Sequence, residues 1–160
     1  MLLVVFAALA AFNLQALPGE GAFVVFDESG QGLITFDAAR IERDGDMRRV
    51  PVIALSGPDA GVGRAFALYP YQIDCRNRRF RVERFAIFNE DLSFDQDHPT
   101  SEPDWDAVSP NAPIAQVFGQ VCEGKNLPTR GTDLRVLSQD YWRARGVEGE
   151  TPRSPDDRQA

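Results

Sequence analysis

The stretch YQIDCRNRRFRV (residues 71–82) carries one of the two cysteines of this 160-residue chain at a change of pattern. The residues before Cys75 are typical of the end of a strand, and beyond it Phe80 and Val82 alternate with charged side chains. Such alternation predicts a half-buried strand with one solvated face. Arg76-Asn77 is therefore predicted to form a hairpin turn, with Cys75 beside it.

Upstream of this hairpin, runs of β-branched and aromatic residues predict further strands. They cover residues 22–27, 32–37, 39–43 and 47–55. Asp44-Gly45 lies between the last two, and this dipeptide readily adopts the positive φ angles of a tight hairpin. Pro51 lacks a backbone N–H, which predicts that its strand lies at a sheet edge or a bulge.

Downstream, residues 89–106 are acidic and poor in apolar side chains, which indicates a surface loop. Ser109-Pro110 is predicted to begin a helix that ends at Gly124. Its apolar face repeats at helical spacing, with Cys122 at its C-terminal end: Ile114, Val117, Phe118 and Val121. A second helix is predicted to start at Thr132 or Asp133 and to bury Leu134, Leu137, Tyr141 and Trp142.

The composition favours a single globular domain with an acidic surface. Hydrophobic residues make up 43% of the chain, and 24 acidic against 17 basic side chains give a net charge of −7. An acidic surface repels the phosphates of nucleic acids, so no nucleic-acid partner is expected.

Residues 1–21 are predicted to be a signal peptide, cleaved after Ala16 or Ala22. Its apolar run of about 12 residues is too short to cross a bilayer, so no transmembrane span is expected in the mature chain. A buried N-terminal helix is the alternative for this segment. The polar residues 147–160 are predicted to be a disordered tail.

The two cysteines of an exported chain are most simply interpreted as one disulfide, here Cys75–Cys122. A zinc site is disfavoured because the chain has one histidine and no C-x-x-C motif. A nucleophilic Cys75 remains open, since neighbouring arginines would lower the pKa of its thiol and His98 could serve as its base.

The string DCRNRRFR (residues 74–81), followed by Trp105, Pro110 and the pair Val121-Cys122, resembles the surface-adhesin protein E family of bacterial envelope proteins. The segment FDAARIERDGDMRRVPV upstream is similar to the opening of that family. The similarity extends from about Thr35 to Gly124. Cys75 and Cys122 match the family as bridge partners, and Asp74, Trp105 and Pro110 match as structural markers.

The resemblance implies an α+β fold: a twisted antiparallel sheet of about five to six strands, with a C-terminal helix tethered to it by one disulfide. This family domain would span residues 22–124, and residues 125–146 would add a further helix. Characterised relatives are adhesins that bind host matrix and serum proteins, so a periplasmic or cell-surface location and a protein partner are expected. The resemblance transfers no ligand-binding residue.

Two clusters of charged residues are candidate sites. Arg79 and Arg81 share one strand face and form a candidate binding patch, although such residues are often only a solvated face. Residues 91–102 have acidic or hydroxyl side chains at the spacing of a calcium loop: Asp91, Ser93, Asp95, Asp97 and Glu102. Gln96 stands where such a loop requires glycine, so a solvated acidic loop is preferred and no metal site is predicted.

No catalytic or cofactor-binding motif is recognisable, so no catalytic residue and no cofactor are assigned. The sequence therefore predicts a non-catalytic, exported envelope or surface protein that binds another protein. Two alternatives stay open: a periplasmic accessory subunit of an envelope assembly, and a hydrolase that uses carboxylates.

Overall fold

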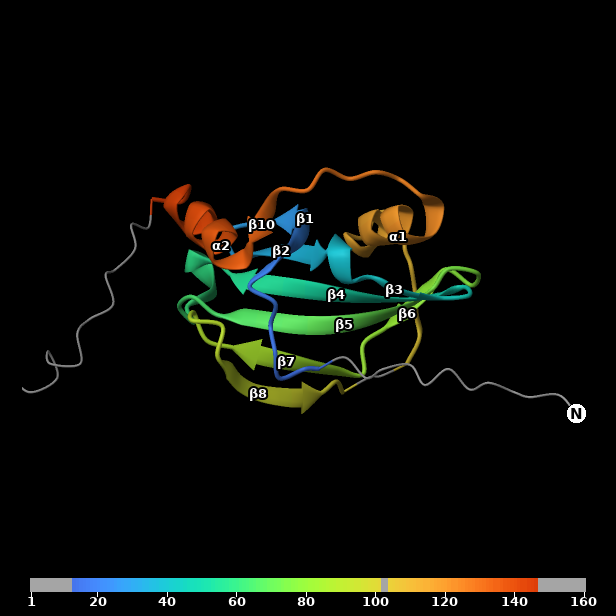
Figure 1. Ribbon diagram of the computed structural model, residues 1–160, viewed down its shortest axis with the longest axis horizontal. Helices are drawn as coiled ribbons and strands as arrows, with labels where there is room; N and C mark the ends of the chain where they lie inside the picture. Colours follow the sequence, from blue (N-terminus) through green and yellow to red (C-terminus); the bar gives the residue numbers. More distant parts are fainter. Residues whose placement is uncertain (1–12, 102–103, 147–160) are drawn as a thin grey trace, which may run out of the picture.

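The computed structural model describes residues 13–101 and 104–146. These residues form one antiparallel sheet of ten strands with two α-helices at its opposite ends (Figure 1). The strands are β1 (Glu20–Glu28), β2 (Gly32–Asp37), β3 (Glu42–Asp44), β4 (Met47–Ser56), β5 (Phe66–Asp74), β6 (Arg79–Arg81), β7 (Arg84–Phe88), β8 (Phe94–Pro99), β9 (Asp106–Ala107) and β10 (Gly131–Asp133). The helices are α1 (Ile114–Glu123) and α2 (Leu134–Arg143), with short 3-10 turns η1 (Ala38–Arg40) and η2 (Pro58–Ala60).

The predicted fold class is confirmed: an α+β fold in which one disulfide links α1 to the sheet. The predicted number of five to six strands is too low, because several strands have only two or three residues. Neighbouring strands follow the order β10-β1-β2-β4-β5-β6-β9. β3 pairs with β4, and β7 pairs with both β5 and β8.

The two long strands β4 and β5 form the centre of the sheet, and a proline interrupts each of them at the same level. Pro51 of β4 lies directly opposite Pro70 of β5. Neither has an N–H, so the pair shares no backbone hydrogen bond and neither proline can donate to a strand on its outer flank. On those flanks pairing changes from β2 to β3 beside Pro51 and from β7 to β6 beside Pro70. The edge position predicted for Pro51 is therefore wrong, because β4 is paired on both sides. The proline lies where the partner strand on one side changes from β2 to β3.

The predicted hairpin around Asp44-Gly45 is present, with Asp44 paired to Met47 and Gly45-Asp46 as the two turn residues. Gly45 takes the positive φ of 53° that this turn needs. The hairpin after β5 has a longer turn than predicted, because Asp74 pairs with Arg79 across four residues. The two hairpin tips meet, since the Cys75 N–H donates to the Asp46 carbonyl at 2.9 Å.

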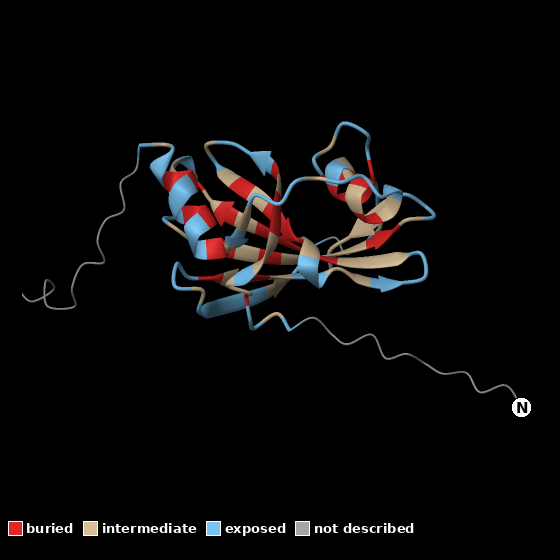
Figure 2. Cartoon of the chain, turned by 45° about the horizontal axis from the view of Figure 1, so that its top comes forward, coloured by how far each residue is buried: buried red, intermediate tan, exposed pale blue. Residues whose placement is uncertain are grey.

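Each helix covers one part of the sheet, and the buried residues gather where helix and sheet face each other (Figure 2). Helix α2 packs with Phe23, Leu33, Ile53 and Leu55 in one cluster. Helix α1 packs on the other face, where β4 presents Val50 and Val52. Asp133 caps α2 as predicted, by accepting from the backbone N–H groups of Arg135 and Val136.

Helix α1 begins after Pro113, so the start predicted at Ser109-Pro110 is wrong. A helix starting at Pro110 would need the N–H of Pro113 for its first hydrogen bond to the Ser109 carbonyl, and proline has none. The segment instead forms a turn in which the Ala112 N–H donates to Ser109.

The loop predicted over residues 89–106 contains strand β8 and the start of β9, so this prediction is also corrected. β8 lies at the edge of the sheet beside β7, and its side chains are exposed or half-buried. A strand without a buried face shows no apolar alternation, so its sequence is that of an acidic loop. The leader and tail predictions fall in part on residues 1–12 and 147–160, which lie outside the described residues.

Candidate functional site: an apolar groove beside helix α1

The predicted disulfide joins the turn after β5 to the end of helix α1. The Cys75 and Cys122 sulfurs are bonded, with Cα atoms 5.4 Å apart. Because both sulfurs are in the bond, Cys75 is neither a free nucleophile nor a thiolate ligand. The bridge holds α1 against the sheet, which gives the two cysteines a structural role.

Asp74, one of the residues of the resemblance, is buried and closes the same turn. Its carboxylate accepts hydrogen bonds from the Asn77 side chain at 2.7 Å and backbone at 3.1 Å, and from Arg79 Nε at 3.0 Å. These bonds, those from Asn77 first, hold the pKa of Asp74 below its ordinary value. The side chain thus organises the turn that carries Cys75.

Arg79 and Arg81, the candidate binding patch, lie side by side on β6 and share one aromatic neighbour. Each guanidinium carbon is 4.7 Å from the ring centroid of Trp105. Arg79 also pairs with Asp74, and Arg81 pairs with Glu83 at 2.9 Å. Both cations therefore already have partners within the chain, and they hold the Trp105 segment onto β6.

Pro110 is exposed in the turn before α1. The remaining arginines of this region pair with carboxylates: Arg76 with Asp46, Arg78 with Glu123, and Arg84 with Asp97.

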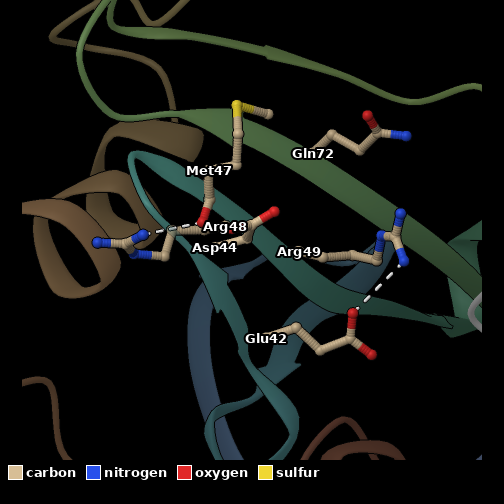
Figure 3. A pocket seen from close by; sticks show the side chains of 6 residues that line it. All are labelled: Glu42, Asp44, Met47, Arg48, Arg49 and Gln72. Carbon is tan, nitrogen blue, oxygen red and sulfur yellow. Dashed lines mark hydrogen bonds and ion pairs between the residues drawn. The ribbon is translucent and has the colours of Figure 1, made fainter. Parts of the chain in front are cut away.

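A small polar pocket lies on the same sheet face as Arg79 and Arg81, between β3, β4 and β5 (Figure 3). In it Arg49 pairs with Glu42 at 3.4 Å, and Gln72 lies opposite Arg49. Arg48 points away toward α1 and donates to the Val121 carbonyl at 3.1 Å. The cavity measures about 50 Å³, well below the usual range of about 300–1,000 Å³ for ligand sites.

A larger, mostly apolar groove of about 520 Å³ opens on the α1 face of the sheet, where the helix does not cover the strands. Its floor is a row of residues paired directly across five adjacent strands. The row runs Asp27 (β1), Ile34 (β2), Ala54 (β4), Ala67 (β5) and Ile87 (β7). The hollow forms because the two central strands present only alanine methyl groups between larger isoleucines.

The walls of the groove come from the loop after β4 and from Ser29 and Gln31 of the turn between β1 and β2. The Ser56 hydroxyl accepts from the Ala65 N–H at 2.8 Å, which closes the loop that carries Ala60 and Val62. Val62 lines the groove yet is 68% exposed, the highest value among the large apolar side chains of the described residues. On the helix side, Ile34 packs against the α1 cluster, and Gln116 of α1 donates to the Phe26 carbonyl at 2.9 Å.

The charges around the groove are acidic. Asp27 is the one ionisable residue among those that line it, it is exposed, and it forms no ion pair within the described part of the chain. Asp59 is exposed next to the lining residue Ala60, and beyond Ile87 the row continues to the neutral Gln96 of β8. The groove therefore combines an apolar floor with a negative charge at its Asp27 end, an arrangement suited to apolar ligands that carry positive charge.

The side chains of the candidate calcium loop do not converge on one position where an ion could bind. Asp95 and Asp97 lie on the extended strand β8, and Asp91 accepts from the Ser93 N–H at 2.9 Å in a turn before it. Glu102 lies outside the described residues. Across residues 13–101 and 104–146, no three acidic, histidine or cysteine side chains cluster as metal ligands.

Sequence reasoning missed the groove. A signal was available in the alternation of β4 and β5, where Ala54 and Ala67 replace the larger residues expected on a covered face. Their pairing across the strands follows only from the register.

Comparisons of the chain with models of protein families, with curated proteins and with solved structures find no match. The resemblance to the surface-adhesin protein E family therefore stays a prediction. No helix in the described segments has the length and hydropathy to span a membrane. A disulfide fits a protein that matures in an oxidising compartment outside the cytosol.

Proposed function

We propose that this chain is a non-catalytic, exported envelope protein that binds another protein through the apolar groove beside α1. The observation that carries the proposal is the open row of Ile34, Ala54, Ala67 and Ile87, which lines a groove beyond the part of that sheet face that packs under α1. Exposed apolar patches with polar surroundings are typical of interaction sites. The location, at the periplasmic or outer surface, is part of the same proposal.

The disulfide supports a binding role because it limits movement of the helix that packs on the same sheet face as the groove. Helix α1 is held by the bridge at its C-terminal end and by the bond from Gln116 to Phe26 nearer its start. A surface that is already rigid loses less conformational entropy when a partner binds. The Arg79–Arg81 patch is assigned a different role, since both cations have partners in the chain.

Site-specific photo-crosslinking in the cells that make the protein tests this proposal. A photoreactive amino acid at Val62, on the groove wall, is expected to give one discrete covalent adduct with a second protein. The matched control is Val136, which is 51% exposed on α2 and does not line the groove. Adducts of equal yield at both positions, or none at Val62, would contradict binding through the groove.

A further inference from the structure

The floor of the groove has a pattern of chemistry along its length that constrains what it binds. Ile34 and Ile87 are three strand spacings apart, which is about 14 Å at about 4.8 Å per spacing. An extended polypeptide covers this distance with about four residues. One spacing beyond Ile34 lies the carboxylate residue Asp27, directly paired with it.

The acidic end of the row has no counter-ion within the described residues. Glu28, next to Asp27, is occupied by Arg130 and by Arg145 at 3.1 Å, and these cations hold the pKa of Glu28 below its ordinary value. Asp27 has no such partner, and no basic side chain lines the groove. Charge complementarity therefore disfavours an anionic ligand and favours a cation at this end.

We infer that the groove binds an extended segment of a partner protein with about four consecutive apolar residues and a lysine or arginine at one end of them, the cation lying against Asp27. The inference rests on the proposed function, whose binding site it uses. The apolar side chains of the segment fill the space above Ala54 and Ala67. Its cation forms the ion pair that Asp27 does not form within the described residues. A second copy of this chain is a poor occupant, because its net charge of −7 would repel the acidic end of the groove.

Three labelled peptides test the chemistry in the purified oxidised protein by fluorescence anisotropy. The sequences are Lys-Leu-Val-Val-Leu-Lys, the same core with glutamate ends, and a polar core of serine and glycine with lysine ends. The first is expected to bind at least about tenfold more tightly than either of the others, because each lacks one of the two complementary features. Binding of the first peptide should weaken with added salt, which screens the exposed charges.

Matched substitutions locate the binding. Ala67→Leu fills the hollow and is expected to weaken the basic apolar peptide at least about tenfold. The same change at the exposed Ala107 of β9, which does not line the groove, is expected to leave it unchanged. Asp27→Asn is expected to weaken binding of the basic apolar peptide about threefold to fivefold. The control Asp44→Asn, at the exposed end of β3, is expected to leave binding unchanged. Because Asp27 is exposed, Asp27→Asn is not expected to affect folding. It therefore tests the binding site even where Ala67→Leu disturbs the fold.

The outcomes separate this inference from the proposed function. An adduct at Val62 together with equal binding of the basic and acidic peptides would contradict the preference for a basic ligand. It would leave the proposed binding of a protein in the groove intact. No adduct and no peptide binding would overturn both. Equal loss of binding in Ala67→Leu and Ala107→Leu would show that the peptide binds elsewhere.

Discussion

At the scale of single residues, Asp74 shows how one buried carboxylate organises a turn. Its oxygens accept from the Asn77 backbone and side chain and from Arg79, while the neighbouring residue Cys75 forms the disulfide. Hydrogen bonds to the charged form lower its pKa, so the folded state binds a proton less readily than the unfolded chain. Folding is therefore favoured by this group where it is ionised in both states.

Asp74→Asn is expected to destabilise the protein by about 1–2 kcal/mol at pH 7, because it removes charge-assisted hydrogen bonds. In the wild type this contribution is present above the unfolded-state pKa of about 4 and is lost as the pH falls through the lower folded-state pKa. The stability difference between the two proteins should therefore shrink in strong acid. Urea unfolding at several pH values measures it, with Asp44→Asn as an exposed control. A difference that stays constant down to pH 2 would contradict the role of the ionised carboxylate.

At the scale of elements, the disulfide fixes a helix to a sheet that it otherwise contacts through one apolar face. Ile114, Val117, Phe118 and Val121 supply that face, and Cys122 follows at its end. The bridge spans a sequence separation of 47 residues, so reduction restores considerable freedom to the unfolded chain.

Replacing both cysteines by alanine is expected to lower the free energy of unfolding by about 4 kcal/mol, from the chain-entropy model. The measurement is chemical denaturation of the oxidised wild type, the reduced wild type and the double variant. The last two should agree. Equal stability of the oxidised and reduced wild type would show that the bridge contributes nothing to folding. Weaker peptide binding in the double variant would further indicate that the bridge rigidifies the sheet face on which the groove lies.

At the scale of the whole molecule, the chain before β1 is part of the fold. Leu17 is 8% exposed in the cluster with Phe23 and Leu134, and the Gly19 carbonyl accepts from the Leu134 N–H at 2.8 Å. Cleavage after Ala22 would remove Leu17 and the first residues of β1, whereas cleavage after Ala16 would keep both.

The mature protein is therefore expected to begin at Leu17, which intact mass spectrometry of the exported chain measures. A chain that starts at Phe23 is expected to be less stable by at least about 2 kcal/mol, because it loses a buried leucine and strand pairing. A mature N-terminus at Phe23 in a fully stable protein would contradict this expectation.

Much of the local structure was predictable because its signals lie close together in the sequence. The alternation of Phe80 with arginines, the glycine turn at Gly45 and the cap at Asp133 each depend on neighbours within a few residues. β8 was missed because, as an edge strand, it buries neither face. The start of α1 was missed because one proline, Pro113, removes the hydrogen bond that Ser109 would need.

The sequence by itself determined most of the strand and helix segments, the cap of α2 at Asp133 and the two cysteines that pair, since these depend on local periodicity and on covalent chemistry. Only the tertiary structure decided that Pro51 and Pro70 face each other and that Asp27, Ile34, Ala54, Ala67 and Ile87 form one row. The reason is that strand register joins residues far apart in the chain. A hollow between them appears only when the helix that packs on that face leaves part of it open.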